Sequence, residues 1–298
     1  MTAKRLTAAL LILLALTQVH WVGQAAPIPP AAKGLAQLNW AHNEDRALLG
    51  VGQWYAWGLN SCGTDYDHCT PMNRNWDVAA QTFCPPRLLL GNEPTNPEPA
   101  GHPIAASVAA SVTVAIEAAC PGMVIVAANI HLNNQLNNGV VAARQWVIDY
   151  LAAYQQMAGH AFGEPHRLGI HCYAGWAYDC TNRIAELKAA IVYSGKYWLT
   201  EFGLWGSPVG SAGQLEHFLT WAPVMFPDIE RYYLWTNRSD PNCCSGWPFE
   251  LVDGNGNLTA MGQVYADWTP PAVSQAWFPV VSRLPGGYPP PVAGTYGP

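Results

Sequence analysis

Charged side chains are scarce in this chain of 298 residues. Asp, Glu, Lys and Arg make up 11% of it, the net charge is −6, and no stretch concentrates lysines or arginines. Proteins that bind nucleic acids or anionic membrane surfaces usually do so through basic patches. We therefore expect neither partner. We expect a monomer whose surface relies on uncharged polar and aromatic side chains, with 14 Trp and 13 Tyr available.

A hydrophobic run long enough to cross a membrane is also missing. The apolar segment Leu6–Val19 is shorter than the roughly 20 residues that a spanning helix needs. It follows the basic pair Lys4 and Arg5 and precedes the small residues Gly23 and Ala25, which predicts a secretory signal peptide over 1–25. A membrane anchor is the alternative. The predicted location of the mature protein is extracellular.

No segment of 20 to 50 residues repeats along the chain, which argues against solenoids and propellers. A zinc site is not indicated either, because Cys62, His68 and Cys69 have no second Cys-x2-Cys or His-x3-His element beside them. We expect no metal and no cofactor.

The eight cysteines, an even number in a chain predicted to be secreted, favour disulfides, although they allow many connectivities. We expect the local pairs Cys62–Cys69, Cys84–Cys120 and Cys172–Cys180. Cys243 and Cys244 could bond to each other or to distant partners.

Short apolar runs alternate with longer amphipathic or Ala-rich stretches, which is typical of βαβ units and a parallel sheet. The predicted strands are Gly34–Gln37, Val51–Trp57, Thr70–Asn73, Arg87–Asn92, Met123–Ala128, Leu168–Tyr173, Lys196–Glu201 and Arg231–Thr236. The predicted helices are Pro103–Ala119, Val140–Ala158, Asn182–Ser194, Ala212–Trp221 and Leu258–Trp268, the last capped by Thr259 or Asn257. Eight strands in a chain of this length predict a compact (β/α)8 TIM barrel of class α/β.

The early part of this pattern is irregular. Residues 57–70 are rich in Gly, Asn, Asp and Cys and are barely long enough for a parallel crossover, so we expect a disulfide-tied loop and a barrel whose N-terminal half lacks one or two helices. The predicted organisation is a signal peptide over 1–25, a lead over 26–33, the barrel over 34–268 and a Pro/Gly-rich tail over 269–298. The tail could be a loose extension, a strap on the barrel base or a linker.

Two glutamates follow apolar runs at predicted strand ends, Glu93 after the fourth strand and Glu201 at the end of the seventh. In a (β/α)8 barrel these ends form the catalytic face, where strands four and seven lie across the mouth from each other. Paired carboxylates there suit cleavage of a glycosidic bond. The sequence leaves their separation open, and with it the choice between a retaining and an inverting mechanism. For each glutamate the alternative is a structural ion pair, for example of Glu93 with Arg87.

Several motifs in order narrow this hypothesis. They are Lys33–Ala36, Trp54–Trp57, Thr70–Met72, Asn92–Pro94, Gly169–Tyr173, Thr200–Phe202, Tyr233–Trp235 and Leu251–Thr259. In this order they resemble the retaining clan A glycoside hydrolases, and within them glycoside hydrolase family 128. The resemblance implies a compact barrel and an endo-β-1,3-glucanase.

Position by position, the resemblance implies that Glu93 is the acid/base and Glu201 the nucleophile. Asn92 is similar to the residue that hydrogen-bonds the sugar 2-hydroxyl, and Tyr173 to the phenol that hydrogen-bonds the nucleophile. His171 would line the same cleft. A carboxyl that faces a second carboxylate should have a raised pKa, which we expect for Glu93, while Glu201 must stay ionised.

The aromatic residues near the predicted strand ends are candidates for stacking against sugar rings. These are Trp235, Trp54 and Tyr55, although neighbours on one strand must point opposite ways. Trp57 and Trp176 are weaker candidates.

The chain departs from the family pattern at Gly91 and Thr95, which leaves the glucan linkage open. The segment Ser239–Trp247, which contains the cysteine pair, follows strand eight and could narrow or extend the cleft.

The prediction is a secreted retaining endo-glycosidase that acts on a polysaccharide, most specifically β-1,3-glucan. Another clan A activity (β-1,4-glucanase, xylanase or mannanase) is the first alternative, and a barrel that only binds glycan is the second.

Overall fold

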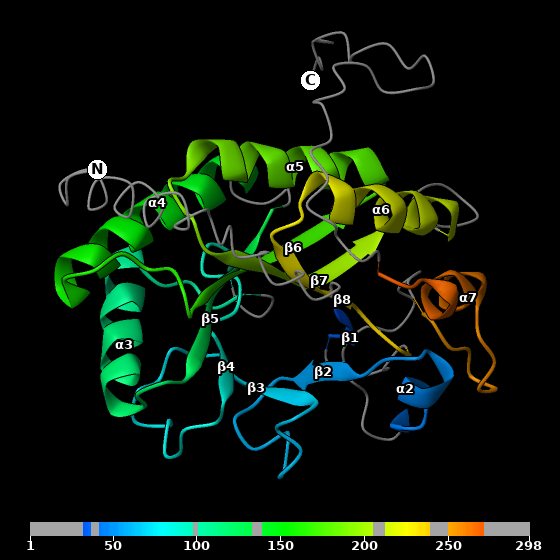
Figure 1. Ribbon diagram of the computed structural model, residues 1–298, viewed down its shortest axis with the longest axis horizontal. Coiled ribbons are helices and arrows are strands. Elements are labelled where there is room, and N and C mark those ends of the chain that lie inside the picture. Colours follow the sequence, from blue (N-terminus) through cyan, green and yellow to red (C-terminus); the bar gives the residue numbers. More distant parts are fainter. Residues whose placement is uncertain are drawn as a thin grey trace, which may run out of the picture. The chain divides into compact units, whose positions relative to one another are not determined.

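The computed structural model describes residues 32–36, 42–97, 101–132, 139–204, 212–238 and 250–270. Eight parallel strands close into a barrel in the order of the sequence (Figure 1). They are β1 (Ala32–Leu35), β2 (Gln53–Ala56), β3 (Cys69–Asn73), β4 (Arg87–Leu90), β5 (Val124–His131), β6 (Arg167–Ala174), β7 (Lys196–Leu204) and β8 (Ile229–Leu234). The predicted fold and all eight predicted strands are confirmed, with shifted ends.

Three predictions fall on other parts of the chain. The signal peptide, the Pro/Gly-rich tail beyond residue 270 and the Cys243–Cys244 segment lie outside the described residues. Within the described ranges, no helix has the length and apolar character needed to cross a membrane.

The strands are apolar on both faces because each lies between two layers of side chains. In β4, Leu89 points into the barrel, where it packs with Met72 and Val126. Its neighbours Leu88 and Leu90 point outward into the larger core beneath the helices. Burial on both sides explains why the barrel strands show continuous hydrophobic runs rather than alternation.

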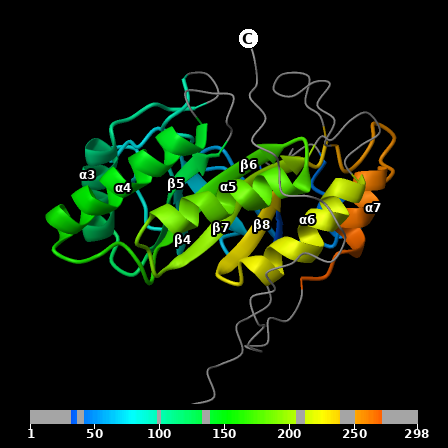
Figure 2. The same cartoon turned by 90° about the horizontal axis from the view of Figure 1, so that it is seen from above.

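Five helices correspond to the five predicted ones. They are α3 (Ala106–Ala119), α4 (Gly139–Ala158), α5 (Ala177–Ala190), α6 (Ala212–Met225) and α7 (Ala260–Asp267). In Figure 2, α5 and α6 lie over strands β6, β7 and β8. Thr259 caps α7, since its hydroxyl accepts a hydrogen bond from the Gly262 amide at 3.0 Å. A single further turn, α2 (Asp45–Leu48), was not predicted.

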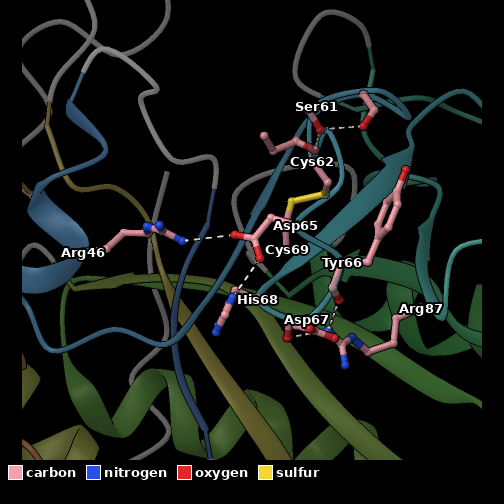
Figure 3. Close-up of a disulfide and its surroundings, with 11 residues drawn as sticks. Arg46, Ser61, Cys62, Asp65, Tyr66, Asp67, His68, Cys69 and Arg87 are labelled. Carbon is pink, nitrogen blue, oxygen red and sulfur yellow. Dashed lines mark hydrogen bonds and ion pairs between the residues drawn. A yellow bond between two sulfur atoms is a disulfide. The ribbon is translucent and has the colours of Figure 1, made fainter.

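Two helices are missing from the N-terminal half of the barrel, as predicted. Neither the β2–β3 nor the β3–β4 connection, both fully described, contains one. The Cys62–Cys69 disulfide ties the first connection, and Asp65 in the same loop accepts from His68 at 2.7 Å (Figure 3). Arg87 donates to the backbone carbonyls of Tyr66 and Asp67 in this loop. Arg87 is thus engaged away from Glu93, and the alternative of an Arg87–Glu93 ion pair is wrong.

The other two disulfides join strands or their connections to helices. Cys84–Cys120 links the β3–β4 connection to the end of α3, and Cys172–Cys180 links β6 to α5. All three predicted local pairs are confirmed, and none of the described cysteines is free.

Candidate active site

Glu93 lies on a tight turn that follows β4. Gly91 has φ +80°, and a Cβ there would lie 2.0 Å from the Trp76 ring, so only glycine fits. This contact explains the departure from the family pattern at this position. Glu93 itself has φ +46°, an unusual conformation for a residue with a side chain. Its amide donates to the Asn129 carbonyl at 3.1 Å and its carbonyl accepts from the Asn96 amide at 2.9 Å, and these bonds hold the strained residue in place.

Asn129 joins this turn to a bulge in β5. The register of β5 against β6 shifts between Ala127 and Ile130, and Ala128 and Asn129 both have positive φ. The buried Asn129 amide donates to the Gly91 carbonyl at 2.8 Å and to the Leu90 carbonyl at 3.3 Å. The bulge therefore supports the backbone that carries Glu93.

Glu201 lies inside β7, which runs on to Leu204, rather than at the end of the strand as predicted. Its side chain is buried and accepts two hydrogen bonds. The Tyr55 hydroxyl, from β2, donates to Oε1 at 2.6 Å, and the Tyr173 hydroxyl, from β6, donates to Oε2 at 2.8 Å. Two strands besides its own therefore orient this carboxylate.

His171 bridges the two carboxylates. Its Nδ1 lies 3.0 Å from Glu93 Oε1 and 3.3 Å from Glu201 Oε2, and its side chain is fully buried. One ligating atom from each of the three residues lies within 4.8 Å of the others. The prediction that His171 lines the cleft is wrong, because it has no exposed surface and lies between the acidic groups.

Glu93, His171 and Glu201 are the one cluster of at least three His, Cys, Asp or Glu residues in the described ranges that could hold a metal ion. All four carboxylate oxygens already have protein partners: Tyr55 and Tyr173 on Glu201, and His171 and Asn96 on Glu93, the Asn96 amide donating to Oε2 at 2.9 Å. Each of these oxygens therefore has one hydrogen-bond partner within the protein.

The surroundings shift the pKa values of the two carboxyls in opposite directions. Burial and the charge of Glu93 raise the pKa of Glu201 above its usual range, against the charge of His171 and the two phenol hydrogen bonds. Burial also raises the pKa of Glu93, but the His171 hydrogen bond and the imidazole charges of His131 and His171 outweigh it, so this pKa is lowered. The expectation of a raised pKa for Glu93 is therefore wrong for the free protein.

The imidazole between them explains this result. Burial lowers the pKa of His171, but the nearby charges of Glu201 and Glu93 and the Glu93 hydrogen bond raise it overall. A proton on Nδ1 of His171 lies within reach of both carboxylates and offsets their repulsion. His171 and Glu93 are therefore linked by a hydrogen bond along which a proton can be shared.

The two candidate aromatics on β2 point in opposite directions. Tyr55 faces into the barrel, is completely buried and binds Glu201. Trp54 faces outward into the core beneath the helices, with the Arg46 guanidinium 5.6 Å from its ring centroid. Both predictions of a stacking platform are wrong, since Tyr55 acts as a hydrogen-bond donor and Trp54 lies away from the site.

Trp235 directly follows β8 and is partly exposed. Its ring centroid lies 5.6 Å from that of Tyr173 and 5.7 Å from that of the partly exposed Trp57. A row of three rings therefore runs from the carboxylates to the mouth of the barrel, where a sugar ring could stack. Trp176, on the β6–α5 connection, is 43% exposed and stacks on Tyr178 instead.

Asn92 is buried directly before Glu93, and its carbonyl accepts from the His102 amide. Three residues around Glu93 were not predicted: Asn96, Asn129 and His131. The sequence offered one signal for the last two, because the polar residues Asn129 and His131 follow the apolar run of the fifth strand as Asn92 and Glu93 follow the fourth. For Asn96 the only signal was its spacing of three residues from Glu93.

Comparisons with known proteins indicate the family of the chain. A sequence model of the family described as "Glycosyl hydrolase catalytic core" matches residues 37–265. No functionally curated protein sequence matches the chain.

Several solved structures share the fold. An endo-beta-1,3-glucanase of glycoside hydrolase family 128, subgroup II, from Pseudomonas viridiflava is 21% identical with a TM-score of 0.60, over 80% of this chain and 98% of that one. An exo-beta-1,3-glucanase of subgroup VI from Aureobasidium namibiae is 13% identical with a TM-score of 0.56, over 80% and 98%. An oligosaccharide-binding protein of subgroup VII from Trichoderma gamsii is 16% identical with a TM-score of 0.54, over 80% and 94%.

The family match covers strands β2 to β8 and most of α7, including both glutamates and the residues that contact them. It confirms the family predicted from the order of the motifs. The chain belongs to the glycosyl hydrolase catalytic core family, the group that its motifs indicated as glycoside hydrolase family 128.

Proposed function

We propose that this protein is a secreted retaining glycoside hydrolase that cleaves β-1,3-glucan internally. The observation that carries the proposal is the pair of buried carboxylates, whose closest ligating oxygens lie within 4.8 Å of each other. Retaining glycosidases keep their two carboxyl groups about 5–5.5 Å apart, whereas inverting enzymes need about 6.5–9.5 Å to fit a water between them. The short separation supports a covalent mechanism with two steps.

In the first step, Glu201 attacks the anomeric carbon and the glycosidic bond breaks. The phenols of Tyr55 and Tyr173 hold both carboxylate oxygens, so the attacking group is fixed in orientation. The leaving oxygen takes a proton from Glu93. The hydrogen bond between Glu93 Oε1 and His171 Nδ1 supplies that proton from the shared pair.

In the second step, Glu93 acts as a base on a water molecule that displaces Glu201 from the sugar. Ester formation has removed the negative charge of Glu201, which had raised the proton affinity of its neighbours. Glu93 can therefore remain ionised until it takes the proton of the attacking water. A sugar ring at the cleaved position would lie against Trp235, and Asn92 would meet its 2-hydroxyl, as the family resemblance implies.

The substrate class rests on the relatives. Two of the similar solved structures are described as beta-1,3-glucanases, one endo and one exo. Three disulfides support a destination in an oxidising compartment, consistent with the predicted signal peptide and with an extracellular polysaccharide as substrate.

Release of reducing ends from laminarin, carboxymethylcellulose and xylan tests the proposal. We expect cleavage of laminarin with early release of oligosaccharides rather than glucose. Cleavage of xylan but not laminarin would indicate another clan A activity. The anomeric configuration of the first product, followed by NMR, tests retention.

A glycan-binding protein without activity is the second candidate, because a similar fold is described as oligosaccharide-binding. The site argues against it, since a binder gains nothing from two carboxylates held so close that they repel. Binding of laminarin-derived oligosaccharides with no release of reducing ends would favour this candidate.

A further inference from the structure

His131 is the last residue of β5, and the bulge in that strand decides where its side chain points. Val126 faces into the barrel, so strict alternation would turn Ile130 inward and His131 outward. The register shift between Ala127 and Ile130 reverses this order. Ile130 joins the outer core, and His131 faces the mouth beside the carboxylates.

The contacts of His131 place it next to Glu93. Its Nε2 lies 3.9 Å from Glu93 Oε1, which is too far for a hydrogen bond. Its ring packs against Tyr173, with centroids 5.5 Å apart and planes inclined by 31°. The side chain is only 7% exposed, and Nδ1 has no hydrogen-bond partner among the residues that the structure describes.

A buried polar atom without a partner costs about 1–3 kcal/mol, and natural proteins keep few of them. Such an atom beside a catalytic carboxylate indicates that a ligand provides the missing partner. The charged and titratable groups around the ring are Glu93, His171, Tyr173 and Arg183. Burial, with the charges of His171 and Arg183, lowers the pKa of His131 to about 4, against the charge of Glu93, so the ring is uncharged near neutral pH.

An uncharged imidazole suits a hydroxyl group, to which it can donate with one nitrogen and from which it can accept with the other. The carboxylate that His131 approaches is Glu93, which in the proposed reaction meets the oxygen of the departing sugar. The sugar on that side of the cleaved bond must therefore pass close to His131.

We propose that His131 binds a hydroxyl of the leaving-group sugar beside Glu93, and that the bulge of β5 exists to present it there. The inference rests on the proposed function and adds a residue to it. In the second step, a sugar can compete with water as the acceptor. This acceptor sugar would bind at the same place beside His131 and Glu93.

The test compares two substrates with different leaving groups. In laminarihexaose the leaving group is a sugar, whereas in β-laminaribiosyl fluoride it is fluoride, which occupies no sugar subsite. His131→Phe keeps the ring and its packing on Tyr173 but removes both nitrogens. We expect its kcat/KM to fall about tenfold on laminarihexaose, as for one lost hydrogen bond, and less than threefold on the fluoride.

Two further measurements make the test robust. Transfer to added laminaribiose, relative to hydrolysis of the fluoride, should also fall about tenfold in His131→Phe, because the acceptor uses the same subsite. His217→Phe is the control, at an exposed position on α6. It should change neither the ratio of kcat/KM on the two substrates nor the ratio of transfer to hydrolysis. If His131→Phe fails to fold, His131→Ala gives the same comparison, with the thermal unfolding midpoint measured alongside.

Equal losses on both substrates would overturn the inference, since they indicate a structural role, and so would no loss on laminarihexaose. Both results leave the proposed function intact as long as the wild-type protein cleaves laminarihexaose with retention. A wild-type protein that cleaves neither substrate would contradict the proposed function itself.

Discussion

The two carboxylates of the site lie close together but are held by different chemistry. Glu201 lies in a regular strand and accepts hydrogen bonds from two phenols, Tyr55 and Tyr173. Glu93 lies on a turn with positive φ and is surrounded by two imidazoles, those of His171 and His131, and by the amide of Asn96.

The difference matches what the proposed mechanism requires of each carboxylate. Burial raises the pKa values of both phenols well above their usual range, so they stay protonated and can only donate to Glu201. Imidazoles gain and lose protons in the physiological range. Two phenols that stay protonated thus hold the proposed nucleophile, Glu201. His171, an imidazole, hydrogen-bonds the proposed acid/base, Glu93, at 3.0 Å and lies 3.3 Å from Glu201.

The largest effect is expected at Glu201. Its replacement in Glu201→Ala removes the nucleophile, and activity on laminarin should fall on the order of 10⁴-fold or more. Added azide should restore turnover with an α-glycosyl azide as product, because the small anion then attacks from the vacated face. Glu216→Ala, at an exposed position on α6, is the matched control. Wild-type rates in Glu201→Ala would show that the assignment is wrong.

The loss at Glu93 should depend on the leaving group. In Glu93→Ala no acid protonates the departing sugar, so laminarihexaose cleavage should fall about 10²- to 10⁴-fold. Formation of the covalent intermediate from β-laminaribiosyl fluoride should fall much less, since fluoride leaves without a proton. Pre-steady-state rates of fluoride release measure this step. Equal losses on both substrates would refute the role of acid.

Removal of one phenol should weaken the nucleophile without abolishing it. Tyr173→Phe or Tyr55→Phe removes one hydrogen bond to a carboxylate, worth about 1.5–3 kcal/mol, which corresponds to about 10- to 100-fold in kcat/KM. The donors stabilise the ionised form, so their loss raises the pKa of Glu201 further. The acidic limb of the pH profile of kcat/KM should therefore move to higher pH.

A control separates this effect from general destabilisation. Tyr150→Phe removes a buried hydrogen bond between α4 and Thr113 of α3, away from the site. It should lower the unfolding midpoint and leave the acidic limb in place. A Tyr173→Phe variant with an unmoved acidic limb would contradict the proposed role of the phenols.

The smallest effect is expected at Asn96, which contacts Glu93. Asn96→Ala removes the amide that donates to Glu93 Oε2. This donor favours the ionised form, so its loss raises the pKa of Glu93, and the basic limb of kcat/KM should move to higher pH. Movement of the acidic limb instead would show that Asn96 controls the pKa of Glu201 rather than that of Glu93.

Much of the fold could be predicted because it depends on local patterns. Runs such as Leu88–Leu90 identify strands buried on both faces, and the short segment between Trp57 and Thr70 leaves no room for a helix. The Cys62–Cys69 and Cys172–Cys180 disulfides join cysteines only seven and eight residues apart, which local spacing already brings together. The ends of β5 and β7 were predicted less well, because barrel pairing extends these strands past the predicted ends.

The surroundings of the glutamates were harder to predict. Adjacent residues on a strand face opposite sides, and only the barrel shows that Tyr55 faces inward and Trp54 outward. The bulge at Ala128 and Asn129 has no clear signature in the sequence, and without it His131 would point away from the site. The pKa shift of Glu93 was predicted in the wrong direction because the position of His171 between the carboxylates was unknown.

The sequence by itself determined the eight strands, the order of the barrel and the placement of Glu93 and Glu201 at its mouth, because hydrophobic periodicity and turn residues are local properties. Only the tertiary structure decided how close the carboxylates come and which side chains touch them. Those contacts join residues from β2, β4, β5, β6 and β7, and their geometry depends on register, bulges and closure of the barrel. Such relations arise between strands, so no single stretch of sequence carries them.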